Sequence, residues 1–216
     1  IHTMGDIAMA SLRSEDWLYK MFGIDAELLI DHAWGYETCR MSDIKNYHSE
    51  EHSLSNGQVL MRNYSFDEAL VIVREMTDNL VLDLFEKGLV TSSLTLWIAY
   101  DHRYEHEASK GTVKLERESN SSKKIIDAVE DLYLRIADRY TGIRRIEVCA
   151  NRVVPEGYVQ YSLFDDPKQT DKERHLQEAV LNVKQRYGKN AIMRGSNLLE
   201  CSTYRERNEQ IGGHRA

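Results

Sequence analysis

The alternation of hydrophobic and polar residues along positions 47–152 predicts the order strand, helix, strand, strand, helix, strand. The first helix begins after Ser65, which lies three residues before Glu68, the spacing of a capping box. It ends at Lys87-Gly88. Its apolar stripe consists of Phe66, Ala69, Leu70, Val73, Leu80, Val81 and Leu84.

The later strands alternate with a period of two, which is typical of strands with one buried face. Their apolar positions are Leu94, Leu96, Ile98 and Tyr100, then Val113 and Leu115, then Ile146, Val148 and Ala150. A second helix begins after Ser121-Ser122 and is predicted to end at Thr141-Gly142. Its apolar side consists of Ile125, Ile126, Val129, Leu132, Tyr133, Ile136 and Ala137.

Two one-sided helices and four alternating strands predict an α+β fold of βαββαβ order, a four-stranded sheet with both helices on one face. The other face of the sheet is predicted to be open and polar. This arrangement hosts many unrelated activities, so by itself it gives no function.

The segments on either side of this domain also read as helical. Short stripes in residues 1–40, joined by tight glycine turns, suit a helix-hairpin-helix whose amides hold a phosphate, or else a plain fragment of a helical bundle. Residues 168–216 begin with a helix that Gly188 ends. From Ser202 onward the chain is polar and is expected to be poorly ordered.

The composition is that of an ordinary globular protein, with 216 residues and 42% hydrophobic content. No apolar run approaches the ~20 residues of a membrane span, and the first four residues resemble the middle of a longer protein rather than a leader. Cys39, Cys149 and Cys201 are too widely spaced for a disulfide framework or a CxxC metal site. A reduced, cytoplasmic location is therefore expected.

The distribution of charge along the chain matters more for possible partners than the net charge does. A formal charge of −7 disfavours nucleic acid as a partner. The basic residues, however, are concentrated in residues 168–216 and in local clusters of the βαββαβ segment. Local basic patches therefore have to be judged one by one.

Several short motifs resemble the thumb and little finger of Y-family translesion DNA polymerases. Residues 1–8, Ile-His-Thr-Met-Gly-Asp-Ile-Ala, resemble the family's "GI-x-T-x-GDLA" hairpin, and Phe22-Gly23 followed by Ala33-Trp34-Gly35 resembles its continuation. Ser53-Leu54-Ser55 resembles the start of the first little-finger strand, and residues 142–146 resemble its last strand, "IRRIGV". The likeness covers residues 1–165 and is greatest to the UmuC-like, DNA polymerase IV-like bacterial branch.

This resemblance implies a thumb fragment at 1–40, a little finger at 41–155, a clamp-binding linker at 156–167 and a tail at 168–216. It implies that the catalytic palm, with its Mg²⁺-binding carboxylates, precedes residue 1, so that this fragment holds no cofactor. The implied partners are primer–template DNA and the bacterial sliding clamp. The implied process is the repair of DNA damage in the SOS response.

DNA contact is expected on the open sheet face, where small donors can approach phosphates without reading bases. The stretch Ser109-Lys110-Gly111-Thr112 combines a cation, two hydroxyls and an unobstructed backbone. The resemblance implies that this stretch and Arg144-Arg145 hold the duplex backbone; the alternative is ordinary strand residues and a solvated strand end. The predicted DNA-binding residues are Ser53, Ser55, Ser93, Thr95, Ser109, Lys110, Gly111, Thr112, Lys114, Arg144 and Arg145.

A clamp-binding motif is indicated after the last strand, at Gln160-Tyr161-Ser162-Leu163-Phe164. Two adjacent large hydrophobes in a polar linker are unfavourable unless something buries them. The segment is similar to the bacterial clamp-binding pentapeptide "QL-S/D-LF", with Tyr161 at the tolerant second position. The predicted contacts are Gln160, Ser162, Leu163 and Phe164, and the alternative is that Leu163 and Phe164 pack back onto the domain.

No catalytic residue and no metal site are predicted. Two-metal phosphoryl transfer needs clustered carboxylates, whereas the acidic residues here lie on polar helix faces or in loops. His102 and His106 have the i, i+4 spacing of a helical zinc pair, but they lie in a loop without an indicated third ligand.

Three functions remain open at this point. The first is the DNA-binding and clamp-tethering part of a translesion polymerase. The second is a protein-interaction adaptor that uses the sheet, and the third is a small-molecule enzyme on the same common fold. Salt-dependent binding to primer–template DNA separates the first from the second. The third needs a pocket with convergent titratable groups, which the sequence does not indicate.

Overall fold

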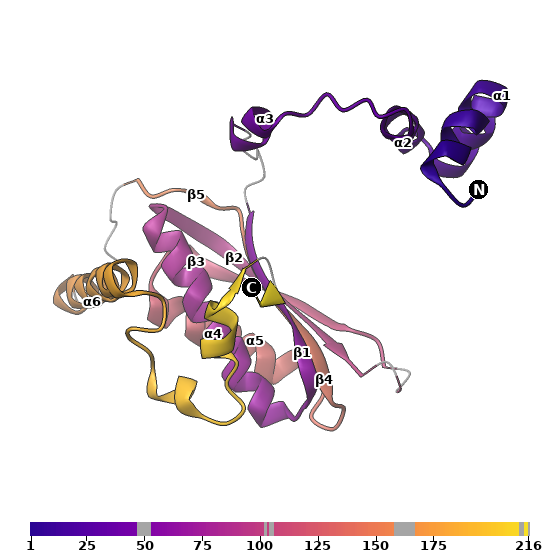
Figure 1. Ribbon diagram of the computed structural model, residues 1–216. Helices are drawn as coiled ribbons and strands as arrows, with labels where there is room; N and C mark the ends of the chain where they lie inside the picture. Colours follow the sequence, from indigo (N-terminus) through magenta and orange to yellow (C-terminus); the bar gives the residue numbers. More distant parts are fainter. Residues whose placement is uncertain (47–52, 102, 104–105, 158–166, 212–213, 216) are drawn as a thin grey trace. The chain divides into compact units, whose positions relative to one another are not determined.

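The computed structural model describes residues 1–46, 53–101, 103, 106–157, 167–211 and 214–215 (Figure 1). Contacts within the chain divide it into two units, residues 1–50 and 51–216. The described part of the first unit contains the helices α1 (Met4–Phe22), α2 (Asp25–Ala33) and α3 (Met41–Asn46). None of the helices in the described ranges is long and apolar enough to cross a membrane.

The first unit confirms the helices expected near the start of the chain. The Thr3 hydroxyl accepts a hydrogen bond from the Asp6 N–H, and the Asp6 carboxylate accepts one from the Thr3 N–H, which forms a capping box. The helix α1 continues through a kink at Ser14 (φ −157°, ψ 61°) up to Phe22. Gly23, at φ 61°, then provides the turn into α2.

The second unit is built on an antiparallel sheet of β1 (Ser53–Tyr64), β2 (Leu89–Tyr100), β3 (Ser109–Ser119) and β4 (Ile143–Asn151). The strands have the order β1-β4-β2-β3, and the short β5 (Val154–Pro155) pairs with the start of β2. The helices α4 (Phe66–Glu86) and α5 (Ser122–Ile136) connect them in the predicted βαββαβ order. The predicted α+β fold is confirmed.

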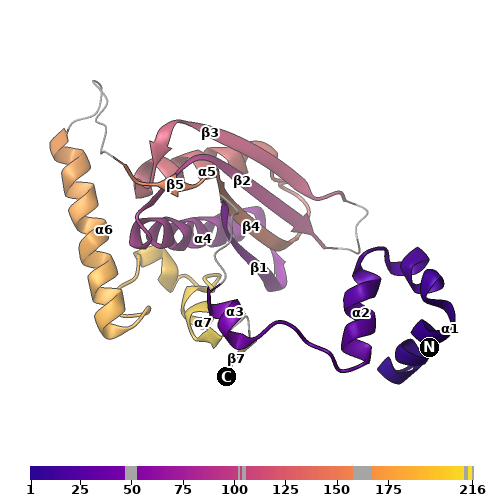
Figure 2. The same cartoon turned by 90° about the horizontal axis from the view of Figure 1, so that it is seen from above.

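The core lies between the sheet and the helices α4 and α5, which pack against each other (Figure 2). Alternate residues of the strands point into it, and their side chains are fully buried at Leu94, Leu96, Ile98, Ile146, Val148 and Ala150. The helices contribute Ile72, Met76, Leu80, Ile125, Val129 and Tyr133. Burial of this apolar surface is the main driving force for folding the unit.

The capping box predicted at the start of α4 is present. The Ser65 hydroxyl accepts from the Glu68 N–H at 3.4 Å, and the Glu68 carboxylate accepts from the Ser65 N–H at 2.9 Å. Arg62 donates two further hydrogen bonds to the same carboxylate. The Arg62 guanidinium and the Ser65 N–H together lower the pKa of Glu68 to about 2.

The second helix ends earlier than predicted, at Ile136 rather than at Thr141. The carboxylate of Asp138 accepts hydrogen bonds from the Tyr140 N–H and the Thr141 hydroxyl. Such local side-chain bonds offer the backbone an alternative to the helix. The segment after Ile136 therefore forms a turn into β4.

The tail, residues 168–216, also differs from the prediction that it is poorly ordered from Ser202 onward. After α6 (Pro167–Tyr187) come η1 (Gly195–Leu198), α7 (Tyr204–Asn208), β6 (Gln210–Ile211) and β7 (His214–Arg215). Glu75 of α4 is only 2% exposed. Its carboxylate accepts a hydrogen bond from the Ser202 hydroxyl at 2.5 Å and another from the Thr203 N–H at 3.3 Å. A buried carboxylate needs such donors, so the segment expected to be poorly ordered is packed onto the domain at Ser202–Tyr204.

Candidate nucleic-acid interface

The candidate site is the sheet face opposite α4 and α5. Directly paired residues of neighbouring antiparallel strands share a face, so the register defines rows of side chains across the sheet. The rows are Ser53–Asn151–Ser93–Lys114, Ser55–Cys149–Thr95–Thr112, Gly57–Glu147–Trp97–Lys110 and Val59–Arg145–Ala99. Predicted DNA-binding residues from all four strands therefore lie on one face.

A chain of polar side chains crosses the second row. The hydroxyls of Thr95 and Thr112 are 2.9 Å apart, and Asn151 Nδ2 donates to Thr95 Oγ1 at 2.8 Å. The Cys149 thiol donates to Asn151 Oδ1. Burial, with a smaller contribution from Glu147, raises the pKa of this thiol, so it stays a neutral donor. If Thr95 donates to Thr112, the Thr112 hydroxyl hydrogen is available to an external acceptor.

Three cationic side chains share this face with the polar chain. Lys110 and Lys114 are exposed on the edge strand β3, on either side of Thr112. Arg145 is exposed on β4, where its guanidinium lies 5.0 Å from the centroid of the Trp97 ring. Its Nη2 atom is also 3.4 Å from Glu147 Oε2, an exposed ion pair of small energy with which a phosphate can compete.

Arg144 is positioned differently from Arg145. Ala99 pairs with Arg145 and Tyr100 pairs with Ile143, so Arg144 is the extra residue of a bulge in β4. Its side chain is half-buried. Of these two adjacent arginines, Arg145 is therefore paired with a residue of β2, whereas Arg144 is not.

Two predicted residues, Ser93 and Ser109, are not available on the open face. Ser93 lies in the first row, yet it is only 6% exposed, since this small side chain lies between Asn151 and Lys114. The Ser109 hydroxyl bonds the Tyr100 hydroxyl at 2.7 Å, on the covered side.

The expectation of an unobstructed backbone at Gly111 is wrong for the helix side of the strand. A Cβ atom there would lie 2.8 Å from Leu132 Cδ1 and 3.0 Å from Ile136 Cγ2. Such distances are too short for non-bonded carbon atoms. The glycine therefore allows α5 to pack closely against β3.

Sequence reasoning did not include Trp97 among the DNA-binding residues, although the alternation of β2 places it on the polar face. A large aromatic side chain among hydroxyls and cations was the available signal, because aromatic rings provide stacking surfaces for bases. Asn151 was missed as well, because its role depends on the register that brings it beside Thr95.

The remaining predictions fall partly outside the described residues. The clamp-binding residues Gln160, Ser162, Leu163 and Phe164 lie there, and so does His102. The His106 ring packs on Tyr100, and its Nε2 atom lies 3.3 Å from Asp138 Oδ2. Within the described ranges, no cluster of three or more His, Cys, Asp or Glu side chains is arranged to hold a metal ion.

A sequence model of the impB/mucB/samB family C-terminal domain matches residues 51–163, more than half of the chain. The chain belongs to this family. The matched residues contain the whole sheet with α4 and α5. Membership confirms the resemblance of the sequence to the C-terminal part of a Y-family polymerase.

Curated relatives extend the similarity beyond the family domain. The chain is 26% identical over 218 residues to "DNA polymerase IV 2" of Bacillus subtilis (strain 168), covering 99% of this chain and 50% of the relative. It is 21% identical over 215 residues to "DNA polymerase IV 2" of Halalkalibacterium halodurans, again covering 99% and 50%. The chain thus spans about half the length of the curated relatives it matches.

A solved structure, the "Y-family DNA polymerase chimera Dbh-Dpo4(243-245)-Dbh", is also similar. It matches with a TM-score of 0.42 and 17% sequence identity, covering 72% of this chain and 42% of that chain.

Proposed function

We propose that this chain is the DNA-binding C-terminal region of a translesion DNA polymerase and that its open sheet face holds primer–template DNA by the phosphates. The observation that supports the proposal is that Lys110, Lys114 and Arg145 share the open sheet face with the exposed Thr112 hydroxyl. These residues come from two strands and share one face because of the register. Their arrangement supplies cations and a hydroxyl donor on the open face of the sheet.

Such a surface binds without reading the sequence. Cations that neutralise phosphates release counterions, and hydroxyls bond phosphate oxygens, but neither contact identifies a base. The net negative charge of the chain is compatible with this binding, because counterion release depends on the cations in contact with phosphate. We therefore expect weak binding that is steeply dependent on salt.

The test is the affinity of the purified chain for primer–template duplexes of two unrelated sequences, measured by fluorescence anisotropy over a series of salt concentrations. The proposal predicts equal affinities for the two sequences, and a logarithm of affinity that falls linearly with the logarithm of salt concentration. Absence of binding at low salt would favour the adaptor function instead. A strong preference for one sequence would contradict phosphate recognition.

In this proposal, nucleotidyl transfer and its Mg²⁺ ions belong to residues outside this chain. The fragment alone, supplied with Mg²⁺, nucleotides and a primed template, should show no templated extension. Any extension above that of a no-protein control would refute this part of the proposal.

We further propose that Gln160, Ser162, Leu163 and Phe164 tether the protein to the bacterial sliding clamp. The support is the motif itself and its place between β5 and α6. A short peptide gains its affinity from a few anchors that enter apolar pockets. Leu163 and Phe164 are suited to be these anchors, while Gln160 provides a directional hydrogen bond.

Replacing Leu163 and Phe164 together by Ala tests the tether. Truncating an anchor typically costs ~2 kcal/mol or more, so clamp affinity should fall at least about a hundredfold. Tyr161→Ala is the matched control and should change the affinity little. Unchanged clamp binding by the double variant would refute the tether, and a large loss of thermal stability would place the two side chains in the core.

A further inference from the structure

A second surface lies on the helix side of the domain, away from the sheet face already described. It is a groove of about 880 Å³ between α4, α5, α6 and the tail. Its apolar lining consists of Leu82, Ile126, Leu176, Val180, Ile192 and Met193. Ligand sites in proteins have volumes of this order, so the groove is large enough to hold several side chains of a partner.

The attachment of α6 to the domain is largely polar, and the apolar residues of this helix are at most partly buried. The buried residue of α6 is Gln177, whose Nε2 donates to the Asn120 carbonyl at 3.0 Å. Glu173 accepts from the Ser121 hydroxyl and the Lys123 N–H, and Arg174 pairs with Glu156. Polar contacts thus attach α6 to the start of α5 and to Glu156, and the helix lies beside α4 (Figure 2).

The groove is therefore lined by apolar side chains that the domain leaves accessible. Leu176 is 63% exposed and Ile192 is 37% exposed. A single exposed apolar residue is ordinary, whereas a contiguous set within a hollow marks an interaction site. Met193 adds a flexible side chain that can adapt to a partner.

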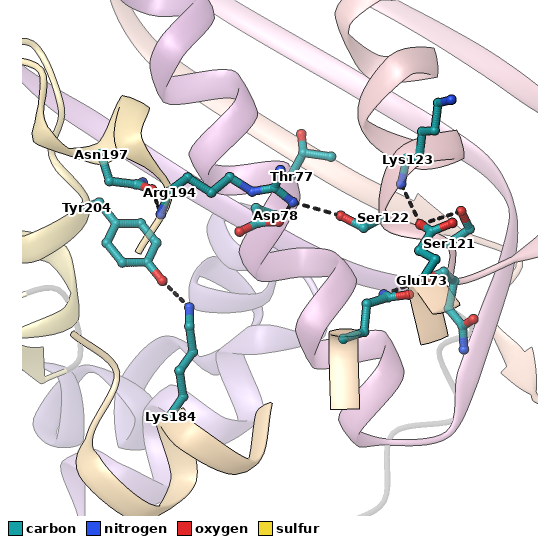
Figure 3. A network of polar contacts seen from close by, with 12 residues as sticks. Thr77, Asp78, Ser121, Ser122, Lys123, Glu173, Lys184, Arg194, Asn197 and Tyr204 are labelled. Carbon is teal, nitrogen blue, oxygen red and sulfur yellow. Dashed lines mark hydrogen bonds and ion pairs between the residues drawn. The ribbon is translucent and has the colours of Figure 1, made fainter. Parts of the chain in front are cut away.

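Polar contacts connect the elements that line the groove (Figure 3). The Arg194 guanidinium lies between Asp78 and Ser122 and donates to them at 2.6 and 3.0 Å. Lys184 of α6 donates to the hydroxyl of Tyr204 in α7. These bonds connect the tail to α4, α5 and α6, so the groove is formed before a partner arrives.

The charge around the groove is positive in a chain whose net charge is negative. The lining contains the basic residues Lys123, Lys168, Lys172, Lys184 and Arg194, and the acidic residues Asp78, Asp127 and Glu173. Two of the three carboxylates already accept hydrogen bonds inside the domain, Asp78 from Arg194 and Glu173 from the start of α5. The ammonium groups of Lys123 and Lys172 form no ion pair with a carboxylate of the described part of the chain.

We propose that this groove binds an acidic amphipathic helix of a partner protein. Apolar residues repeated at i, i+3, i+4 and i+7 on that helix would pack on Leu176, Val180 and Ile126, as in other helix-in-groove complexes. Its flanking Asp and Glu side chains would meet Lys123 and Lys172. DNA fits less well, because its phosphate backbone has no apolar groups to fill the groove.

The test uses the full 216-residue chain and two displayed libraries of helices of about 18 residues, five turns each. Both libraries share the same randomised apolar face, and one carries Glu and Asp on its flanks where the other carries Lys. The proposal predicts enrichment from the acidic library only. The affinity of an enriched peptide, measured by anisotropy, should fall at least about tenfold with Leu176→Glu, which places a charge in the apolar lining.

Two controls make the result specific. Met61→Glu changes an exposed apolar residue of β1, outside the groove lining, and should leave peptide affinity unchanged. Lys114→Glu should weaken DNA binding and leave peptide affinity unchanged. Enrichment from both libraries, enrichment that survives Leu176→Glu, or competition by duplex DNA would overturn the proposal without affecting the proposed function of the sheet.

Discussion

The two faces of the sheet use the same strands for different purposes. On β2, Leu94, Leu96 and Ile98 are fully buried under the helices, while the residues between them, Thr95 and Trp97, are partly exposed on the open face. Neighbouring positions thus alternate between folding and proposed binding. The comparison teaches that a substitution of one residue can test either property separately, because side chains of a strand alternate between faces.

The largest effect is expected on the covered face. Ile98→Ala removes a fully buried side chain and should lower the free energy of unfolding by ~2–5 kcal/mol, because it leaves a cavity in the core. Thr95→Ala on the open face should change it by less than ~1 kcal/mol. Denaturant unfolding of both variants measures the contrast. Equal losses would mean that the open face is also part of the core.

Gly111 on the covered face and Gly57 on the open face allow the same comparison, with a smaller expected change in stability. Gly111→Ala introduces a Cβ 2.8 Å from Leu132 Cδ1 and should destabilise the domain by ~1–3 kcal/mol through overpacking. Gly57→Ala places its Cβ at an ordinary 3.5 Å from Glu147 Cγ on the open face. That variant should be neutral or slightly stabilising. Thermal unfolding distinguishes them, and a harmless Gly111→Ala would contradict the close packing of α5 on β3.

The smallest expected effect is on the pH dependence of stability, and it compares the carboxylates of Glu68 and Glu147. Because the pKa of Glu68 is lowered to about 2 from an ordinary value of 4.5, its contribution is fully present above pH 4.5 and is lost as the pH falls through 2. Glu68 is partly exposed, so solvent limits the effect to ~1 kcal/mol or less. Glu68→Gln should therefore reduce the loss of stability between pH 4.5 and 2. Glu147→Gln on the open face is the control, and an equal change in both variants would contradict the account.

Much of the fold was predictable because it depends on local patterns. Strand alternation placed Leu96 and Trp97 on opposite faces, and the spacing of Ser65 and Glu68 located the start of α4. The end of α5 was missed because the Asp138 turn competes with a helix of good apolar periodicity. The packing of the tail was missed because Ser202 and Glu75 meet only in the folded chain.

The candidate site was predicted less completely than the fold, because it depends on contacts between strands. Alternation shows which residues share a strand face, but the register decides which lie beside one another across strands. The contact of Thr95 with Thr112 and Asn151, and the burial of Ser93, follow from that register. Gly111 shows the remaining difficulty, since a glycine in a strand permits close approach by a helix or by a ligand.

The most direct test of the central claim is the salt dependence of DNA binding when Lys110, Lys114, Arg144 and Arg145 are all replaced by Ala. A matched control replaces four exposed basic residues elsewhere, namely Lys87, Arg135, Lys189 and Arg205, and so removes the same charge. Each lost phosphate contact lowers the slope of log affinity against log salt by roughly one unit. The account predicts a flatter slope for the open-face variant and an unchanged slope for the control. An unchanged slope in the open-face variant, or an equal flattening in both, would contradict it.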